Sequence, residues 1–208
     1  MKWMVICSML FFSSISNWEL GKNEKGIRVY TRSVEGSPIK EVKADLQLEG
    51  SLSSVVAFVK DIPNYPNWMY GCSEARILKM NGDTELYFYQ RIKAPWPVSD
   101  RDLCAHYVIR MDTKTGELKL SSRSEPKLLP EVPGVIRVKN SHSNWIVKSL
   151  GNGKLSGEYH LVTDPAGLIP AWLINMFITD GPLSSLSKMK EGIKTETYKS
   201  KKFNWIKE

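Results

Sequence analysis

The sequence predicts an α+β domain in which a long, curved antiparallel sheet wraps around a C-terminal helix. Between residues 26 and 163, apolar and polar residues alternate in short runs separated by turn sequences, which is typical of strands joined by hairpins. An apolar stripe at helical spacing follows between residues 173 and 193. Because this stripe has to be buried, we expect it to pack on the concave face of the sheet.

Length and composition favour one globular domain. The chain has 208 residues, of which 42% are hydrophobic and 25% charged, and its net charge is +7. This charge permits attraction to nucleic acid or anionic membranes without requiring either. Seven lysines lie between residues 188 and 207, which we interpret as a solvated helix end and a basic tail over 201–208 rather than as a lipid-binding patch.

The first sixteen residues have the layout of a secretory signal peptide. One lysine precedes an apolar run from Trp3 to Phe12, and Ser14 and Ser16 occupy the −3 and −1 positions of a candidate cleavage site. The run is short for a membrane span, and it lacks the charged face of an amphipathic helix. We therefore expect a signal peptide at Met1 to Ser16, a domain at 17–200, and export to the periplasm or outside the cell.

Two strands and a helix open the predicted domain. Residues 26–34 and 39–50 alternate and are joined by the turn sequence EGSP, which predicts a hairpin. Ser51 is a candidate N-cap, and Pro63 ends the helix that follows. The apolar residues of this helix recur at helical spacing: Leu52, Val55, Val56 and Val59.

A meander of strands follows, joined by the turn sequences MNGDT, DTKTG, SHSN and GNGK. The predicted strands span residues 74–79, 85–94, 101–111, 116–124, 135–141, 143–150 and 157–163. The last helix begins near Pro170, and Gly181 with Pro182 predicts a kink in it. Its apolar stripe consists of Leu173, Met176, Phe177, Leu183, Leu186, Met189 and Ile193.

Four segments of the chain together resemble one known family. In order they are WELGKNEKGIRVYTR, IKEVKADLQLEGSLSSVVAFVKDIPNYPNWM, PWPVSDRD and DPAGLIPAWLIN. They are similar to the START family, the StAR-related lipid-transfer domains, in a bacterial-type form that covers Trp18 to Tyr198. The resemblance implies a helix-grip fold with an internal hydrophobic tunnel, gated by the C-terminal helix, that binds or transfers one lipid. It also implies transient contact with a membrane surface and no cofactor.

The resemblance also suggests what the turn sequence APWPVSDRD does. In the family this segment is the corner between two central strands, which implies that Arg101 and Asp102 hold the turn together. Trp96 is then expected to pack within the corner. Sterol-binding members carry a buried acid and arginine at places that fall near Tyr89 and Tyr107, so the resemblance does not extend to a sterol assignment.

Side-chain alternation leaves two registers for the 85–94 strand. One turns Tyr87, Tyr89 and Arg91 inward, while the other buries Leu86, Phe88, Gln90 and Ile92 as an apolar core. In the first register the inward residues of the next strand are Leu103, Ala105 and Tyr107. We favour the first, which suits an amphipathic ligand: tyrosines combine a ring with a hydroxyl, and an arginine can bind a carboxylate or phosphate. The predicted ligand-binding residues are Trp68, Tyr87, Tyr89, Arg91, Tyr107, Trp145, Tyr159, Met176 and Phe177.

Signals for catalysis or metal binding are weak. The chain lacks the G-x-S-x-G, H-E-x-x-H, C-x-x-C and phosphate-loop motifs, and its three histidines lie apart from one another. An enzyme of cyclase or hydrolase type acting on an apolar substrate is the alternative. We expect no metal, no cofactor and no nucleic-acid partner. Cys72 and Cys104 are compatible with a disulfide or with two buried thiols.

Overall fold

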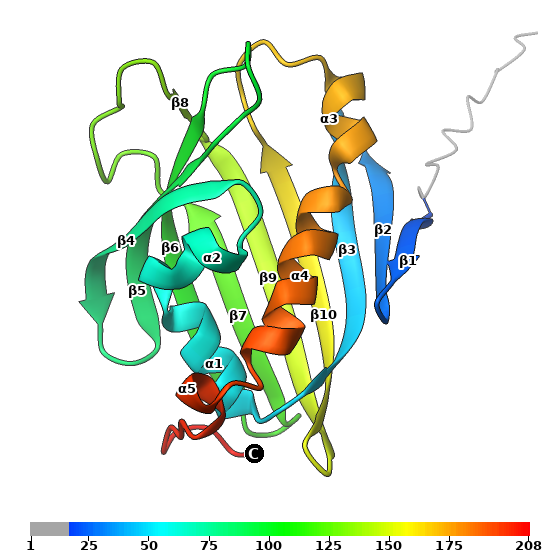
Figure 1. Ribbon diagram of the computed structural model, residues 1–208, viewed down its shortest axis with the longest axis vertical. Helices are drawn as coiled ribbons and strands as arrows, with labels where there is room; N and C mark the ends of the chain where they lie inside the picture. Colours follow the sequence, from blue (N-terminus) through cyan, green and yellow to red (C-terminus); the bar gives the residue numbers. More distant parts are fainter. Residues whose placement is uncertain (1–16) are drawn as a thin grey trace, which may run out of the picture.

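The computed structural model describes residues 17–208 as one curved sheet with the helices on its concave face (Figure 1). The predicted signal peptide, residues 1–16, lies outside the described part. The ten strands are arranged in the order β1-β2-β3-β10-β9-β7-β6-β5-β4, with β8 parallel to β6 and the remaining pairs antiparallel. The sheet is open, and the predicted α+β helix-grip architecture is confirmed.

The strands are β1 (Glu19–Glu24), β2 (Ile27–Val34), β3 (Ser37–Glu49), β4 (Cys72–Asn81), β5 (Glu85–Ile92), β6 (Arg101–Asp112), β7 (Glu117–Ser124), β8 (Ile136–Arg137), β9 (Asn140–Gly151) and β10 (Lys154–Asp164). The helices are α1 (Leu52–Lys60), η1 (Ile62–Asn64), α2 (Tyr65–Trp68), α3 (Ala171–Phe177), α4 (Asp180–Gly192) and α5 (Glu196–Lys199). Pairing of β10 with β3 joins the first hairpin to the end of the meander. This long-range pairing places α3 and α4 across the concave face.

The predicted first helix is confirmed as α1, and its start is set by side chains. The Ser51 hydroxyl accepts a hydrogen bond from the Ser54 N–H at 3.0 Å, and the Ser54 hydroxyl accepts one from the Ser51 N–H at 3.0 Å. This reciprocal capping satisfies two amides that an uncapped helix leaves open. Glu208 adds a second anchor, because its carboxylate accepts the Leu52 and Ser53 N–H groups.

The C-terminal tail packs on the domain, which differs from the solvated tail predicted from its lysines. Ile206 is buried in the core, and Phe203 and Trp205 pack against it. The lysines of this segment remain exposed. Apolar residues between the charges therefore decide where the tail lies, and the charge count alone does not reveal this.

Several predicted element boundaries are corrected. β1 has too few apolar residues for its pairing with β2 to be visible in the sequence. The predicted strand over 135–141 is only the two-residue β8 and the start of β9, and β9 continues through the SHSN sequence that we predicted as a turn. The C-terminal helix is broken after Phe177 rather than kinked at Pro182, which lies in the first turn of α4 where a missing N–H is tolerated.

Candidate functional site

The β5 side chains that face the concave side belong to the register that we did not favour. The Phe88 ring lies 5.7 Å from that of Tyr65 in α2, so Phe88 points toward the helices. Alternation then turns Tyr87, Tyr89 and Arg91 to the convex face, and their predicted place inside is wrong. For β6 the prediction is confirmed, because Leu103, Ala105 and Tyr107 belong to the core beneath the helices.

On the convex face the three side chains have structural partners. The Tyr87 ring stacks on His106 with 4.4 Å between centroids. Tyr89 is buried beneath the guanidinium of Arg76, which lies 5.0 Å from its centroid. Arg91 forms an ion pair with Asp100 at 2.8 Å. The physical reason for the error is that β5 is covered on both faces near its middle, so its two alternating sets of residues are both rich in large side chains.

Aromatic residues do line the concave face. Trp145 and Tyr159 are directly paired across β9 and β10, with ring centroids 4.8 Å apart, and Tyr107 is buried on β6. Burial raises the pKa values of the Tyr107 and Tyr159 phenols well above their usual range. Both groups therefore stay protonated at neutral pH and offer uncharged hydroxyls.

Packing on the concave face is uneven along its length. Beside α4 the core is dense: Leu48, Leu155 and Met189 are fully buried. Toward α3, Ser143, Tyr159 and Leu161 are only half-buried, and α3 itself contributes no buried residue. The part of the concave face next to α3 is therefore the loosely packed one.

Three buried polar side-chain atoms lack hydrogen-bond partners among residues 17–208, and one of them is Nε1 of Trp205 in the C-terminal tail. Trp68 packs on Phe58 and Tyr65, and its side-chain Nε1 is unpaired. Gln90, 6% exposed on the concave face of β5, has an unpaired Oε1. Sequence reasoning missed Gln90 because the register that we favoured turned this residue away from the helices. The signal that could have identified Gln90 is a single amide side chain among the apolar residues of its alternating set.

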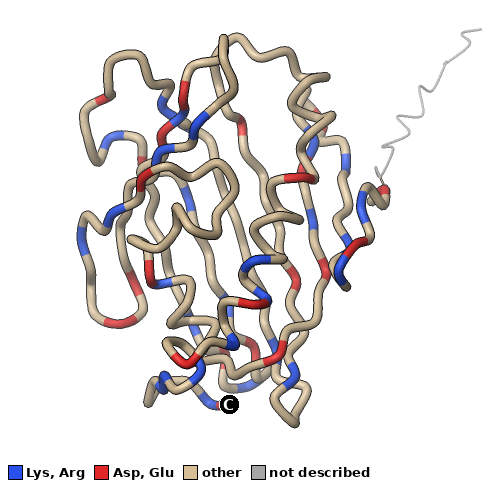
Figure 2. The backbone as a smooth tube through the Cα atoms, in the orientation of Figure 1, with Lys and Arg blue, Asp and Glu red and all other residues tan. Residues whose placement is uncertain are grey.

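The end of the molecule that holds α3 exposes apolar side chains without charges. Met176 and Phe177, predicted to contact ligand, are 59% and 55% exposed, and Trp96, predicted to pack in its corner, is 92% exposed. Leu168 and Trp172 are exposed beside them. Residues 94–99 and 165–179 carry no charged side chain, and both connections lie at one end of the sheet (Figures 1 and 2).

Arg101 and Asp102 hold the corner as expected, although each does so with separate partners. The Arg101 guanidinium donates to the carbonyl oxygens of Ser99, Pro165 and Ala166. Asp102 points to the opposite face, where its carboxylate accepts two hydrogen bonds from Arg137 at 2.6 and 3.0 Å. Arg101 thereby ties the segment before α3 to the β5–β6 corner.

The remaining candidates for chemistry have ordinary surroundings. Cys72 and Cys104 are free thiols on opposite faces of the sheet. His106 lies 2.7 Å from Glu85, and His160 lies 2.7 Å from Glu41. Residues 17–208 contain no cluster of three or more His, Cys, Asp or Glu suited to a metal ion. None of the helices they form has the length and apolarity needed to cross a bilayer.

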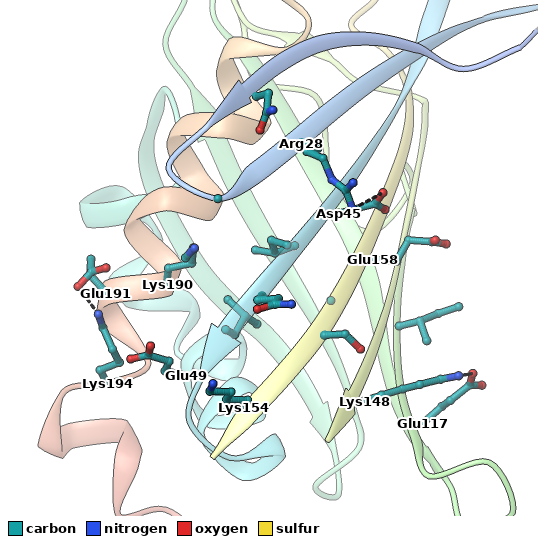
Figure 3. A pocket seen from close by; sticks show the side chains of 18 residues that line it. Arg28, Asp45, Glu49, Glu117, Lys148, Lys154, Glu158, Lys190, Glu191 and Lys194 are labelled. Carbon is teal, nitrogen blue, oxygen red and sulfur yellow. Dashed lines mark ion pairs between the residues drawn. The ribbon is translucent and has the colours of Figure 1, made fainter. Parts of the chain in front are cut away.

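A groove of about 1090 Å³ lies on the convex side, lined by residues of β2, β3, β10, β9 and β7 and by the end of α4 (Figure 3). Its charged side chains are of both signs, and they include the pairs Arg28 with Asp45 and Lys148 with Glu117. Such a polar lining does not suit an apolar ligand. The aromatic, largely apolar concave face is therefore the candidate ligand site.

The fold and this concave face define a helix-grip protein, and sequence comparison identifies the family. The START domain profile matches residues 12–197, so the chain belongs to the START domain family. An uncharacterized protein of Pseudomonas aeruginosa is 32% identical over 84% of this chain and 85% of its own. The phosphatidylcholine transfer protein of Bos taurus is 29% identical over 83% of this chain and 82% of its own.

Solved structures give the same result. The STAR-related lipid transfer protein fragment of Xanthomonas axonopodis is 29% identical, has a TM-score of 0.79, and aligns over 86% of this chain and 99% of its own. Human STARD10 has a TM-score of 0.73 over 85% of this chain and 72% of its own, and at 17% identity it supports the fold.

Proposed function

We propose that the protein binds a lipid or similar hydrophobic molecule between the concave face of the sheet and helices α3 and α4, and transfers it between membranes. The observation that carries this proposal is the aromatic, largely apolar concave face beneath α3, a helix that contributes no buried residue. Burial of acyl chains there supplies the driving force for binding. The relatives named as lipid transfer proteins support the same function.

The exposed apolar end is suited to docking on a lipid bilayer. Trp96 and Trp172 are amphipathic side chains that favour the membrane interface, and Leu168, Met176 and Phe177 add apolar area beside them. This end is also where the concave face is loosely packed. Docking there brings the site next to the membrane from which a lipid leaves.

Helix α3 is suited to act as the gate, because one side chain latches it to the sheet. Asn175 Oδ1 accepts the Lys40 N–H at 3.0 Å, and its Nδ2 donates to the Pro38 carbonyl at 3.0 Å. The break between α3 and α4 allows α3 to move while α4 remains packed through Leu186 and Met189. Opening then requires the loss of few contacts.

An enzyme working in the same site would need an acid or base near the substrate. The concave phenols are poor candidates, since burial raises their pKa values. Catalysis would convert the bound lipid to a new compound, which mass spectrometry detects. The experiment that identifies the bound lipid therefore also separates the two functions.

Native mass spectrometry of protein purified from cells, followed by organic extraction, tests the proposal. We expect one lipid per protein, released on extraction and replaced when the protein is incubated with vesicles. Purified protein that contains no bound lipid and takes up no member of a broad lipid panel would contradict lipid binding and transfer. Conversion of an added lipid to a new compound would support the enzyme instead.

We also propose that the chain is exported, on the basis of its first sixteen residues. Expression of the full chain in a bacterial host, followed by cell fractionation and N-terminal sequencing, tests this. Protein that remains in the cytoplasm with residues 1–16 attached would contradict it.

A further inference from the structure

Gln90 places an unpaired hydrogen-bond acceptor on the concave face. Its side chain is 6% exposed, and its Oε1 has no partner among residues 17–208. Its cross-strand neighbours on this face are Ala75 and Leu103, which offer no polar group. A buried amide without a partner lowers stability, so its presence calls for an explanation outside the protein's own contacts.

The positive charge on this part of the concave face is already paired with groups of the protein. Arg101 is the one charged side chain on the concave face of β5 and β6 among the described residues, and its guanidinium is held by three backbone carbonyls. Arg91 points to the convex face and pairs with Asp100. A phosphate near Gln90 would therefore lack a free cation to neutralise it.

The unpaired atom accepts hydrogen bonds, and this restricts the ligand. A lipid hydroxyl donates one hydrogen bond and accepts others, and so it satisfies Gln90 Oε1 directly. The head group of phosphatidylcholine, a phosphodiester with a quaternary ammonium, has no N–H or O–H to donate. A lipid of that class would leave the Gln90 acceptor unpaired.

We propose that Gln90 binds the hydroxyl head group of a neutral lipid, of the diacylglycerol class, in preference to a phospholipid. This inference rests on the proposed function, and it specifies the ligand of the same site. Lipid binding then gives the buried amide the partner that it lacks, while the uncharged hydroxyls of Tyr107 and Tyr159 keep the rest of the face neutral.

Competition binding with two lipids of identical acyl chains tests this inference. The assay measures how strongly dioleoylglycerol and dioleoylphosphatidylcholine each displace a fluorescent fatty acyl probe. It compares the wild-type full chain with the variants Gln90→Met and Gln47→Met. Methionine keeps the volume and removes the amide, and Gln47 is an exposed glutamine of β3 that serves as the matched control. We expect Gln90→Met to weaken dioleoylglycerol about tenfold, and to leave dioleoylphosphatidylcholine unchanged.

Thermal unfolding without lipid separates a binding role from a structural one. Because Gln90→Met removes an unpaired buried amide, we expect its melting temperature to equal or exceed that of the wild type. A large decrease would assign Gln90 to the fold and overturn the inference.

The other outcomes are distinguishable. Preference for dioleoylphosphatidylcholine, or dioleoylglycerol binding that Gln90→Met leaves intact, overturns the inference while lipid binding stands. In the second case a buried water, not the lipid, pairs with the amide. Failure of both lipids and of the acyl probe to bind contradicts the proposed function itself.

Discussion

Asp102 and Arg137 form an ion pair whose two side chains are each 1% exposed. Arg137 also donates to the carbonyl oxygens of Pro126, Leu129 and Pro130. One guanidinium thus joins β6 and β8 to the segment that follows β7. Removal of one charge from such a pair leaves the other charge buried and uncompensated.

We expect Asp102→Asn to lower the free energy of unfolding by about 3 kcal/mol or more. Asp100→Asn is the matched control in the same corner, because the Arg91 and Asp100 side chains are 36% and 21% exposed. Partly exposed pairs contribute only about 0–1 kcal/mol. Urea unfolding of both variants measures the difference, and equal losses would contradict the assignment of Asp102 as the main anchor.

The lowered pKa of Glu117 predicts that the free energy of unfolding depends on pH in the acid range. Hydrogen bonds from Lys148 and Lys119 lower its pKa from the usual 4.5 to about 2. Because the folded-state pKa is depressed, the stabilisation is present above pH 4.5 and is lost as the pH falls toward 2. We expect Glu117→Gln to reduce the slope of stability against pH in this window, with Glu35→Gln as an exposed control. Identical slopes in the two variants would exclude a contribution from Glu117.

Among the elements, α3 and α4 differ most in how they are held. Met189 and Ile193, at the C-terminal end of α4, are fully buried, whereas the side chains of α3 are exposed or half-buried. The break between α3 and α4, the latch formed by Asn175 and the loosely packed part of the concave face all lie at the same end of the molecule. Local opening of α3 is therefore expected to cost less than opening of α4.

We expect Asn175→Ala to release α3 and to increase the rate of lipid transfer between vesicles severalfold. The substitution removes two hydrogen bonds, each contributing about 1 kcal/mol. Hydrogen exchange should become faster in 171–177 and stay unchanged in 183–192. Uniform acceleration across both helices would indicate general destabilisation and would count against a latch.

Gly192 in α4 is required for helix packing. A Cβ there would overlap the Phe58 ring, whereas a Cβ at Gly181 would lie 3.4 Å from Tyr70, an ordinary contact. Helix propensity alone favours alanine over glycine by about 1 kcal/mol, but overpacking costs about 1–3 kcal/mol. We expect Gly192→Ala to lower the melting temperature and Gly181→Ala to leave it unchanged or raise it. A stabilised Gly192→Ala would show that Phe58 moves aside freely.

At the scale of the whole molecule, charge and apolar surface are separated. The net charge of +7 is spread over the strands and the C-terminal region, intermixed with acidic residues, while residues 165–179 are uncharged (Figure 2). Membrane contact through the exposed apolar end should therefore depend on apolar area rather than on ionic attraction.

We expect the double variant Trp96→Ala with Trp172→Ala to bind dioleoylphosphatidylcholine vesicles at least about tenfold more weakly than the wild type. Vesicle co-sedimentation measures this, with Leu150→Ala as control, since Leu150 is an exposed leucine at the C-terminal end of β9. Binding should persist at high salt. Loss of binding at high salt with no effect of the double variant would move the contact to the basic C-terminal region.

Much of the fold was predictable because its signals are local. The Ser51 cap, the hairpin of β2 with β3 and the apolar stripe that becomes α4 depend on residues close in sequence. β1 could not be predicted, because its exposed residues show little alternation. Of the candidate site, Trp68, Tyr107, Trp145 and Tyr159 lie on the helical side as the residue types suggested, while Gln90 was missed.

The sequence by itself determined the order of strands and helices and the family, since periodicity and motif order are properties of the chain. Only the tertiary structure decided which face of β5 points inward and whether Trp96 and α3 are covered. Alternation with a period of two separates a strand into two sets of residues but does not say which set meets the helices. That choice depends on what packs on each face: Tyr65 of α2 meets the concave face of β5, while the convex side chains of β5 pack against residues of the neighbouring strands β4 and β6.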